Sequence, residues 1–125
     1  MKQIVNSQNA PSPIGPYSQA VKANGMLFIS GQIAINPSTG EMVTTDIVAE
    51  TKQVMNNLNA ILSAAGMNFT NVVKSTIFVK DLNNFATVNK VYGEYFSSEA
   101  PARETVEVSR LPKDANVEIS CIAVK

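Results

Sequence analysis

Hydrophobic positions in the N-terminal third of the chain alternate with polar ones or form short unbroken runs, which is typical of β-strands. Residues 17–23 show partial alternation, and residues 26–31 form a near-continuous apolar run. Asn24-Gly25 between them is a strong hairpin signal, so the pattern predicts an antiparallel strand pair. Residues 7–16 are rich in proline, which cannot donate a hydrogen bond within a sheet, and they are expected to form a loop.

Apolar residues at three- and four-residue steps predict a long helix after a turn at residues 36–40, with a short strand near Met42-Val43 as an optional element. Asp46 can accept a hydrogen bond from the free N–H groups at the start of this helix, and Glu50 is favourable near its positive end. Gly66 can adopt the left-handed conformation that closes it. The stripe consists of Val48, Thr51, Met55, Leu58, Leu62 and Ala65, widened by Val54 and Ile61.

The second half of the chain predicts a strand, a helix and two further strands. Residues 72–80 are enriched in β-branched and aromatic residues and are too short for a typical helix. A helix capped by Asn83 or Asn84 follows, and residues 101–120 are interpreted as two strands, the first from Ala102 to Ser109. The apolar face of the helix consists of Phe85, Val88, Tyr92, Tyr95 and Phe96, with Asn89 at its edge.

The predicted element order is therefore ββαβαββ. Strands and helices interleave without strict repetition, which favours an α+β fold with one mixed sheet and both helices on the same face. The length of 125 residues fits a single domain spanning residues 1–125.

Composition narrows the classes of partner. Ten basic and ten acidic residues cancel, and the chain has no run of Lys or Arg, which counts against nucleic acid as a partner. Charged residues make up only 16% of the chain, which points to burial of surface in an oligomer.

No stretch of 18 apolar residues predicts a membrane span, and the N-terminus lacks the features of a secretion signal. Together with a single cysteine, Cys121, interpreted as a buried small hydrophobe, this predicts a cytoplasmic protein.

The absence of histidine restricts the chemistry further. Catalysis by Ser-His-Asp or Cys-His arrangements is excluded because imidazole is the required base. With one cysteine and no carboxylate cluster at ligand spacing, neither a zinc site nor another metal site is expected. Any reaction at this domain must depend mainly on positioning of the substrate.

Two charged residues near the C-terminus are the best candidates for such positioning. Alternation along the strand from Ala102 to Ser109 places Arg103 and Thr105 on a polar face, and the planar guanidinium suits a carboxylate. The alternative is a surface arginine in a loose ion pair. Glu118 interrupts an apolar strand, where desolvation would raise its pKa and fit it to proton transfer. The alternative there is the solvated face of an edge strand.

Strand arithmetic argues against a self-contained site built by these two residues. If residues 110–116 simply closed a hairpin, Arg103 would lie opposite position 123, about 17 Å from Glu118 at about 3.3 Å per residue. That separation is too long for one small ligand. Either the two strands are not direct neighbours, or the site combines surfaces of two subunits.

Two further residues are candidates for contact with a ligand. Tyr17 can present its phenol as donor and acceptor, or it can anchor the preceding loop as an ordinary partner. Gly31 follows an apolar strand and would allow a ligand to approach the backbone, although a bulge or bend is the alternative.

Several motifs together resemble the RidA/YjgF/YER057c/UK114 family across nearly the whole chain. The motifs are Ile14-Gly15-Pro16-Tyr17-Ser18-Gln19, Ser30-Gly31-Gln32-Ile33, Phe78-Val79-Lys80-Asp81-Leu82, Tyr92-Gly93-Glu94-Tyr95-Phe96, Pro101-Ala102-Arg103 and residues 106–114. The resemblance implies a chorismate-mutase-like subunit in a homotrimer with ligand clefts between neighbouring subunits. It also implies deamination of reactive enamine/imine acids, such as 2-aminoacrylate and 2-aminocrotonate, to 2-oxo acids and ammonia, without a cofactor.

The resemblance also implies roles for individual residues. Arg103 matches the arginine that holds the substrate carboxylate, and Glu118 matches the glutamate that positions or activates water. Tyr17, Gly31 and Asn89 match positions that line the family cleft; Tyr17 is assigned to the catalytic residues with Arg103 and Glu118, and Gly31 and Asn89 to substrate binding. Deaminases of the family commonly have Arg-Ser-Cys where this chain has Arg103-Glu104-Thr105, so Thr105 bears on the substrate range. Strand alternation predicts that Glu104 points to the opposite face.

Two other functions compete with deamination. The same cleft could serve a non-catalytic regulatory module that binds a 2-oxo acid or another small carboxylate. RNA cleavage or inhibition of translation, reported for some relatives, is the weaker alternative because the chain has zero net charge and no basic aromatic patch.

Overall fold

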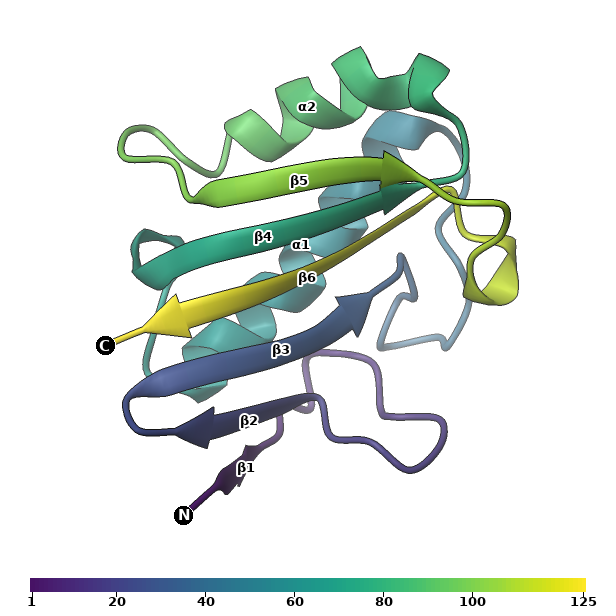
Figure 1. The fold of residues 1–125 in the computed structure, drawn as a ribbon. Helices are drawn as coiled ribbons and strands as arrows, with labels where there is room; N and C mark the ends of the chain where they lie inside the picture. The colour runs from purple at the N-terminus through teal and green to yellow at the C-terminus, as the bar shows by residue number, and fades with distance from the viewer.

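A computed structural model describes residues 1–125 and contains one six-stranded sheet in the order β1-β2-β3-β6-β4-β5 (Figure 1). The strands are β1 (Gln3–Val5), β2 (Ala20–Ala23), β3 (Met26–Gln32), β4 (Val72–Val79), β5 (Ala102–Glu107) and β6 (Val117–Val124). Neighbouring strands are antiparallel except β4 and β5, which are parallel. The sheet is therefore mixed, as the sequence predicts.

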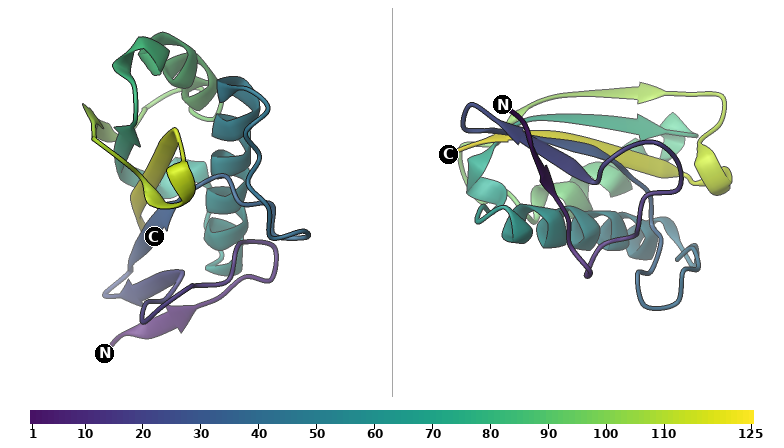
Figure 2. Two further views of the ribbon diagram at one scale, coloured as in Figure 1. Left: turned by 90° about the vertical axis from the view of Figure 1, so that its right-hand side faces the viewer. Right: turned by 90° about the horizontal axis from the view of Figure 1, so that it is seen from below.

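Two helices, α1 (Ile47–Ala64) and α2 (Phe85–Gly93), cover the same face of the sheet (Figure 2). Asp46 caps α1 by accepting a hydrogen bond from the Ala49 N–H at 2.8 Å, and Gly66 follows the helix with φ +73°. Both features confirm the predicted start and end of α1. The side chains with no exposed surface between α1 and the sheet include Leu27, Val54, Met55, Leu58, Ile61, Leu62, Val79, Val117 and Ile119. Neither helix has the length and hydrophobicity needed to cross a lipid bilayer.

The N-terminal hairpin forms at Asn24-Gly25, where both residues have positive φ angles. Its first strand begins at Ala20, so the prediction of a strand from residue 17 was too long. The Gln19 carbonyl oxygen still accepts from the Ser30 N–H at 2.9 Å, but its side chain bonds to the preceding loop. The sequence did not predict β1, because three residues are too few to show a periodicity. The optional strand near Met42 is a single bridge between Ile35 and Met42.

The second helix differs from its prediction at both ends. It ends at Gly93, and Tyr95 and Phe96 lie beyond it, where their rings pack against Phe69 at centroid distances of 5.3 and 5.4 Å. Asn84 makes no capping bond; Asp81 instead accepts from the Asn83 N–H and starts the short 3-10 turn η2 (Leu82–Asn84). The apolar pattern continued past Gly93 because these aromatic rings pack outside the helix. Another 3-10 turn, η1 (Phe69–Asn71), precedes β4.

The two C-terminal strands do not form a hairpin. After β5, the 3-10 turn η3 (Pro112–Asp114) leads into β6, which inserts between β3 and β4 (Figure 1). Strand β4 therefore separates β5 from β6, and β5 becomes the edge of the sheet. This arrangement agrees with the strand arithmetic, which excluded a hairpin site.

The face of the sheet opposite the helices exposes apolar side chains. We call this surface the open face; its most exposed members are Ile4, Phe28, Val106 and Val124, each with 40 to 46% of its surface accessible. Successive residues of a strand point to opposite faces of the sheet. The sequence neighbours of these residues, such as Leu27 and Ala123, therefore point toward the helices and are fully buried. Val48 is also exposed, on α1, so its assignment to the buried stripe was wrong.

Candidate functional site

The pleat of the sheet divides the candidate residues between its two faces. Arg103 pairs with Ser75, which is fully buried beneath the helices, so Arg103 points toward the helix side. Thr105 pairs with the buried Ile77 and shares that side. Glu118 has the opposite orientation because its neighbours Val117 and Ile119 point into the core. Arg103 and Glu118 therefore lie on opposite faces of the sheet.

The first group, on the helix side, consists of Arg103, Asn89 and Thr105. The Arg103 Nη1 donates a hydrogen bond to the Asn89 Oδ1 at 2.7 Å. The three ion pairs of the chain join other residues, so the loose ion pair considered for Arg103 is not formed. The Thr105 Oγ1 is buried and has no hydrogen-bond partner within the chain. A buried hydroxyl normally has a partner, so Thr105 adds an unsatisfied polar atom on the same side of β5 as Arg103.

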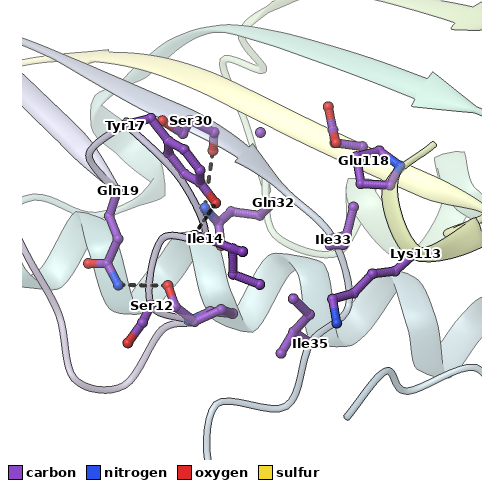
Figure 3. Close-up of a pocket in the computed structure, with 13 residues that line it drawn as sticks. Ser12, Ile14, Tyr17, Gln19, Ser30, Gln32, Ile33, Ile35, Lys113 and Glu118 are labelled. Atoms are coloured by element: carbon purple, nitrogen blue, oxygen red, sulfur yellow. Dashed lines mark hydrogen bonds between the residues drawn. The ribbon is translucent and has the colours of Figure 1, made fainter. Parts of the chain in front are cut away.

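The second group, Tyr17, Gly31 and Glu118, lines a pocket of about 550 Å³ (Figure 3). Three segments build the pocket: the loop at residues 11–19, residues 30–35 at the end of β3, and residues 112–118 around η3. Its wall combines the phenol of Tyr17, the carboxylate of Glu118 and the ammonium of Lys113 with apolar side chains. The sequence analysis had named Tyr17, Gly31 and Glu118 as candidates; Lys113 lies within a family motif, but its place in the pocket emerges only from the fold.

Glu118 and Gly31 are in close contact across the pocket. A Cβ atom built on Gly31 would lie 2.7 Å from Oε2 and 2.9 Å from Cδ of Glu118, so only glycine leaves the carboxylate its present position. The strand register also shifts between Ile29 and Gln32, so Gly31 lies at a bulge as well. Partial burial raises the pKa of the Glu118 carboxyl above its ordinary value, as its place in an apolar strand predicts.

Replacement Gly31→Ala is expected to disable the pocket without unfolding the protein. The new methyl group would push the flexible end of Glu118 aside, while the backbone at this position has an ordinary φ that alanine accepts. Any catalytic efficiency that depends on the Glu118 carboxylate is expected to fall about 10- to 100-fold, the scale of misplacing a general base. Steady-state kinetics with a thermal melt measures both effects. Full activity in Gly31→Ala would show that the observed position of Glu118 is not needed.

The loop that carries Tyr17 is fixed by its own hydrogen bonds. The Tyr17 hydroxyl accepts from the Ile14 N–H at 3.2 Å, so it anchors the loop and remains half-exposed toward the pocket (Figure 3). Gln19 is buried and donates to the carbonyl oxygens of Ser7 and Pro11. The signal for Gln19 in the sequence was its place at the end of the motif that contains Tyr17. Tyr17 anchors the loop and is also exposed enough to contact a ligand.

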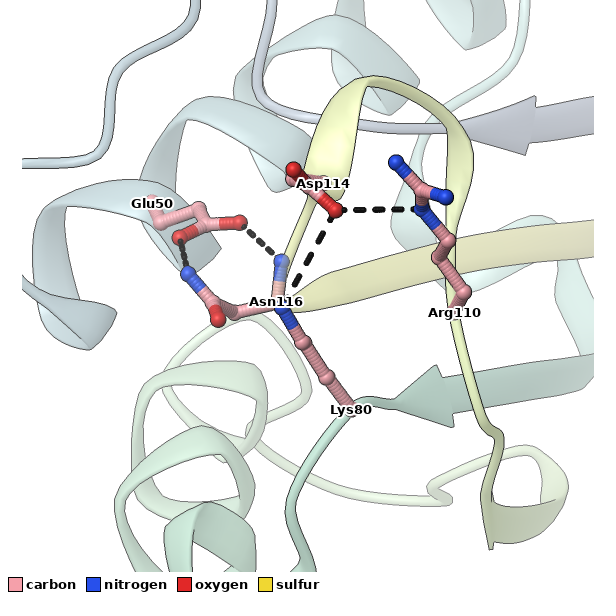
Figure 4. Close-up of polar contacts among 5 residues, drawn as sticks. All are labelled: Glu50, Lys80, Arg110, Asp114 and Asn116. Carbon is pink, nitrogen blue, oxygen red and sulfur yellow. Dashed lines mark hydrogen bonds and ion pairs between the residues drawn. The ribbon is translucent and has the colours of Figure 1, made fainter.

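A buried carboxylate from α1 holds the turn beside the pocket. Glu50 is 1% exposed, and its oxygens accept from the backbone N–H and the side-chain amide of Asn116 at 2.7 and 2.8 Å (Figure 4). Arg110 and Lys80 both approach Asp114 on the outer side of the same turn. Lys113 and Asp114 have left-handed φ angles of 54° and 53°, which side chains rarely adopt. The Glu50 contacts thus hold a strained turn that places Lys113 at the pocket.

Glu104 points away from the first group, as strand alternation predicts. On the open face its carboxylate is 3.1 Å from the Lys74 Nζ and accepts a hydrogen bond from the Thr76 hydroxyl at 3.0 Å. These contacts lower its pKa. The negative charge that replaces the common serine is therefore neutralised on the other side of β5.

Cys121 and the possible metal-ligating side chains are the further candidates for chemistry in this chain. Burial raises the pKa of Cys121 to about 11, so the thiol is protonated and weakly nucleophilic at neutral pH. No three side chains of the His, Cys, Asp or Glu type lie close enough together to hold a metal ion.

Comparison with known proteins gives consistent matches over the whole chain. Residues 7–125 match the family model described as Endoribonuclease L-PSP. A RutC family protein of Pyrococcus horikoshii is 56% identical over 125 residues, covering 100% of this chain and 99% of the relative. The chloroplastic Reactive Intermediate Deaminase A of Arabidopsis thaliana is 45% identical over 98% of this chain, which spans 65% of that longer protein.

Solved structures agree in fold and sequence. The Rid family protein YyfA of Yersinia pestis superposes with a TM-score of 0.98 at 51% identity, with full coverage of both chains. The structure of Escherichia coli TdcF with bound serine has a TM-score of 0.94 at 43% identity, with 98% of each chain covered. The motifs, the fold and these similarities lead to one conclusion: the chain belongs to the Rid family, which includes RidA and YjgF.

Proposed function

We propose that this protein is a hydrolytic deaminase that converts reactive enamine/imine acids of the 2-aminoacrylate and 2-aminocrotonate type into 2-oxo acids and ammonia. Membership of the Rid family and the relative named Reactive Intermediate Deaminase A support a deaminase. The substrate class is the one that the family resemblance implies, and two residues are compatible with it: Arg103 as a cation for the carboxylate and Glu118 as a carboxylate for water.

One observation carries the site assignment. Arg103 and Glu118 lie on opposite faces of the same sheet, so a single subunit cannot direct both onto one small ligand. A second copy that covers the open face would bring its own edge strand toward the pocket. We therefore propose a homotrimer in which the Glu118 pocket of one subunit meets the Arg103 group of the next. The exposed apolar side chains of the open face support such burial.

In the proposed reaction, Arg103 binds the substrate carboxylate with its two-pronged guanidinium. The enamine first tautomerises to the imine, as its β-carbon takes up a proton and its nitrogen loses one, and protonation of the imine nitrogen gives the iminium. Glu118 then accepts a proton from water as the oxygen attacks the iminium carbon, which forms a C–O bond and moves the C=N electron pair onto nitrogen. That nitrogen takes up a proton, the C–N bond breaks, and loss of the hydroxyl proton completes the 2-oxo acid while ammonia leaves. An iminium carbon is already electrophilic, so positioning and one base suffice.

The remaining candidates have supporting roles in this proposal. Tyr17 and Gly31 line the pocket beside Glu118, and Asn89 holds Arg103. Thr105 lies on the Arg103 side of β5 and bears on the substrate range there, although its hydroxyl oxygen is buried.

The direct test adds the protein to a threonine dehydratase reaction that releases 2-aminocrotonate. We expect faster appearance of 2-oxobutyrate and less trapping of the intermediate by a nucleophile such as semicarbazide. The exposed variant Lys52→Ala is the matched control and should behave like the wild type. Unchanged release of 2-oxobutyrate with folded wild-type protein would exclude the deaminase.

The raised pKa of Glu118 predicts an acid limb in the pH profile. The carboxylate must be ionised to accept a proton from water, so kcat/KM should fall as the pH drops through a value above the ordinary pKa of about 4.3. Buffers from pH 4.5 to 8, with the uncatalysed hydrolysis subtracted, measure this limb. Glu118→Gln should abolish the catalysed rate. A flat profile for the wild type would indicate that Glu118 is not the base.

The same shift has an opposite effect on stability. Between the pKa of the unfolded chain and the raised folded pKa, the folded protein binds more protons, so its stability falls as the pH rises through that interval. Glu118→Gln is therefore expected to melt slightly higher at pH 7 than the wild type.

Binding without catalysis is the second candidate function, because the similar TdcF structure was solved with bound serine. Saturable binding of 2-oxobutyrate without acceleration of deamination would favour a regulatory module. RNA cleavage or translation inhibition ranks third. The description of the family model names an endoribonuclease, but ten basic and ten acidic residues offer little attraction for a polyanion.

A further inference from the structure

The surroundings of Arg103 are built by a single stripe of α2. Phe85, Asn89 and Tyr92 are spaced by four and three residues, so they face β5 together. The Arg103 Cζ lies 5.2 Å from the ring centroid of Tyr92 and 5.8 Å from that of Phe85. The Asn89 Oδ1 accepts from Nη1 at 2.7 Å. The guanidinium is thus held on three sides by residues of one helix.

None of these three partners carries a charge. Two present the negative face of an aromatic ring, and the third presents a neutral amide oxygen. The acidic neighbours point elsewhere: Glu104 pairs with Lys74 on the open face, and Glu107 accepts from the Leu82 N–H. Phe85, Asn89 and Tyr92, which we call the holder, therefore restrain the arginine and leave its positive charge uncompensated. A carboxylate partner would fix the side chain equally well but would compete with an anionic ligand.

The two rings differ in what supports them. Tyr92 is 4% exposed, and its hydroxyl donates to the buried Ser75 Oγ at 2.9 Å. Its ring is therefore part of the core and is fixed by β4. Phe85 is 39% exposed at the start of α2, so its ring is accessible beside the arginine. Phe85 can accordingly be replaced with little cost to the core.

We propose that Phe85 and Tyr92 are positioning residues that hold the Arg103 guanidinium, charged and uncompensated, for the carboxylate of a 2-imino or 2-oxo acid. Asn89 completes the holder as a neutral acceptor. This inference rests on the proposed function for the identity of the ligand, whereas the ordering of Arg103 by the rings does not require a ligand.

The ordering is tested first in the ligand-free, full-length protein. Nuclear magnetic resonance relaxation of the Arg103 Nε–Hε group reports how rigidly the guanidinium is held. We expect an ordered group in the wild type and in Phe85→Tyr, which keeps an aromatic face, and a mobile group in Phe85→Leu. Equal order in Phe85→Leu and the wild type would overturn the positioning role.

Binding of 2-oxobutyrate, measured by calorimetry, then tests the consequence. Phe85→Leu should weaken the affinity about two- to fivefold, the scale of one lost cation–π contact, and Phe85→Tyr should restore it. Asn89→Asp keeps an acceptor but adds a negative charge, and about a tenfold or greater loss is expected.

Kinetics separates positioning from a structural defect. In the deaminase assay, Phe85→Leu should raise KM by the same factor with kcat nearly unchanged, whereas partial unfolding would lower kcat at constant KM. Val48→Ala, a truncation of an exposed apolar residue on α1, is the control for surface changes. Wild-type KM and affinity in both Phe85→Leu and Asn89→Asp would overturn the inference. Absence of 2-oxobutyrate binding and deamination in the wild type would instead overturn the proposed function, and with it the ligand named here.

Discussion

Arg103→Ala is expected to lose the proposed deaminase activity almost completely while the protein stays folded. The substitution removes the only positive charge of the helix-side group, and truncating one partner of a charged hydrogen-bonded pair costs about 3 kcal/mol, which corresponds to roughly a 150-fold loss. Arg103 lies on the edge strand β5 and is partly exposed, so its removal leaves the core intact. The dehydratase-coupled rate and a thermal melt measure the two effects.

Arg103→Lys separates charge from geometry. Lysine keeps the positive charge but lacks the planar fork, so it cannot make two parallel hydrogen bonds to a carboxylate. We expect an intermediate loss of about tenfold, expressed mainly in KM. Lys52→Ala removes an exposed positive charge on α1, away from both groups, and is the matched control for loss of charge. A wild-type rate in Arg103→Ala would rule out Arg103 as the carboxylate ligand.

Glu50→Ala has the largest expected effect on stability. The change leaves the backbone N–H and the side-chain amide of Asn116 without their acceptor in a site where Glu50 is 1% exposed. Losing one partner of a buried charged hydrogen-bonded group costs about 3 kcal/mol in the free energy of unfolding. For a chain of this size that loss lowers the melting temperature by about 10 °C.

Urea unfolding at one fixed protein concentration measures the Glu50 effect, because assembly would make stability concentration-dependent. Glu50→Gln keeps one acceptor oxygen and should lose about half as much. Lys52→Ala, an exposed truncation on the same helix, should stay close to the wild type. If Glu50→Ala is as stable as Lys52→Ala, the Asn116 contacts contribute nothing to the folded state.

Loss of the Glu50 contacts is also expected to reach the pocket. The contacts between Glu50 and Asn116 fix the turn that carries Lys113. This turn leads into β6, and Glu118 is the second residue of that strand. Two left-handed residues in that turn relax once it is released. Glu50→Ala should therefore have a lower kcat than the wild type even after the rate is corrected for the fraction of protein that is folded.

Local signals predicted most of the elements, and they did so for identifiable reasons. Asn24-Gly25 specifies a tight hairpin because both residues accept positive φ angles. Asp46 and Gly66 mark the ends of α1 by capping and by the left-handed conformation. Alternation alone placed Arg103 and Thr105 on one side of β5 and Glu104 on the other, since the period of a strand is two. Each of these signals acts within a few neighbouring residues.

Elements without such signals were missed or misjudged. Strand β1 has three residues and forms only because β2 offers an edge to pair with. The prediction extended α2 through Tyr95 and Phe96 because apolar spacing does not distinguish a helix from an aromatic cluster beyond its end. Glu50 matched a favourable position at a helix start, but its partner Asn116 is 66 residues away.

The sequence by itself determined the fold class, the family and which side chains carry the candidate chemistry, because these follow from short-range periodicity and from motifs. Only the tertiary structure decided how the two charged candidates relate. Insertion of β6 between β3 and β4 is set by long-range pairing, which no local pattern encodes, and it directs Arg103 and Glu118 to opposite faces of the sheet. Because a side chain cannot reach through a packed sheet, that geometry makes a second subunit part of the proposed site.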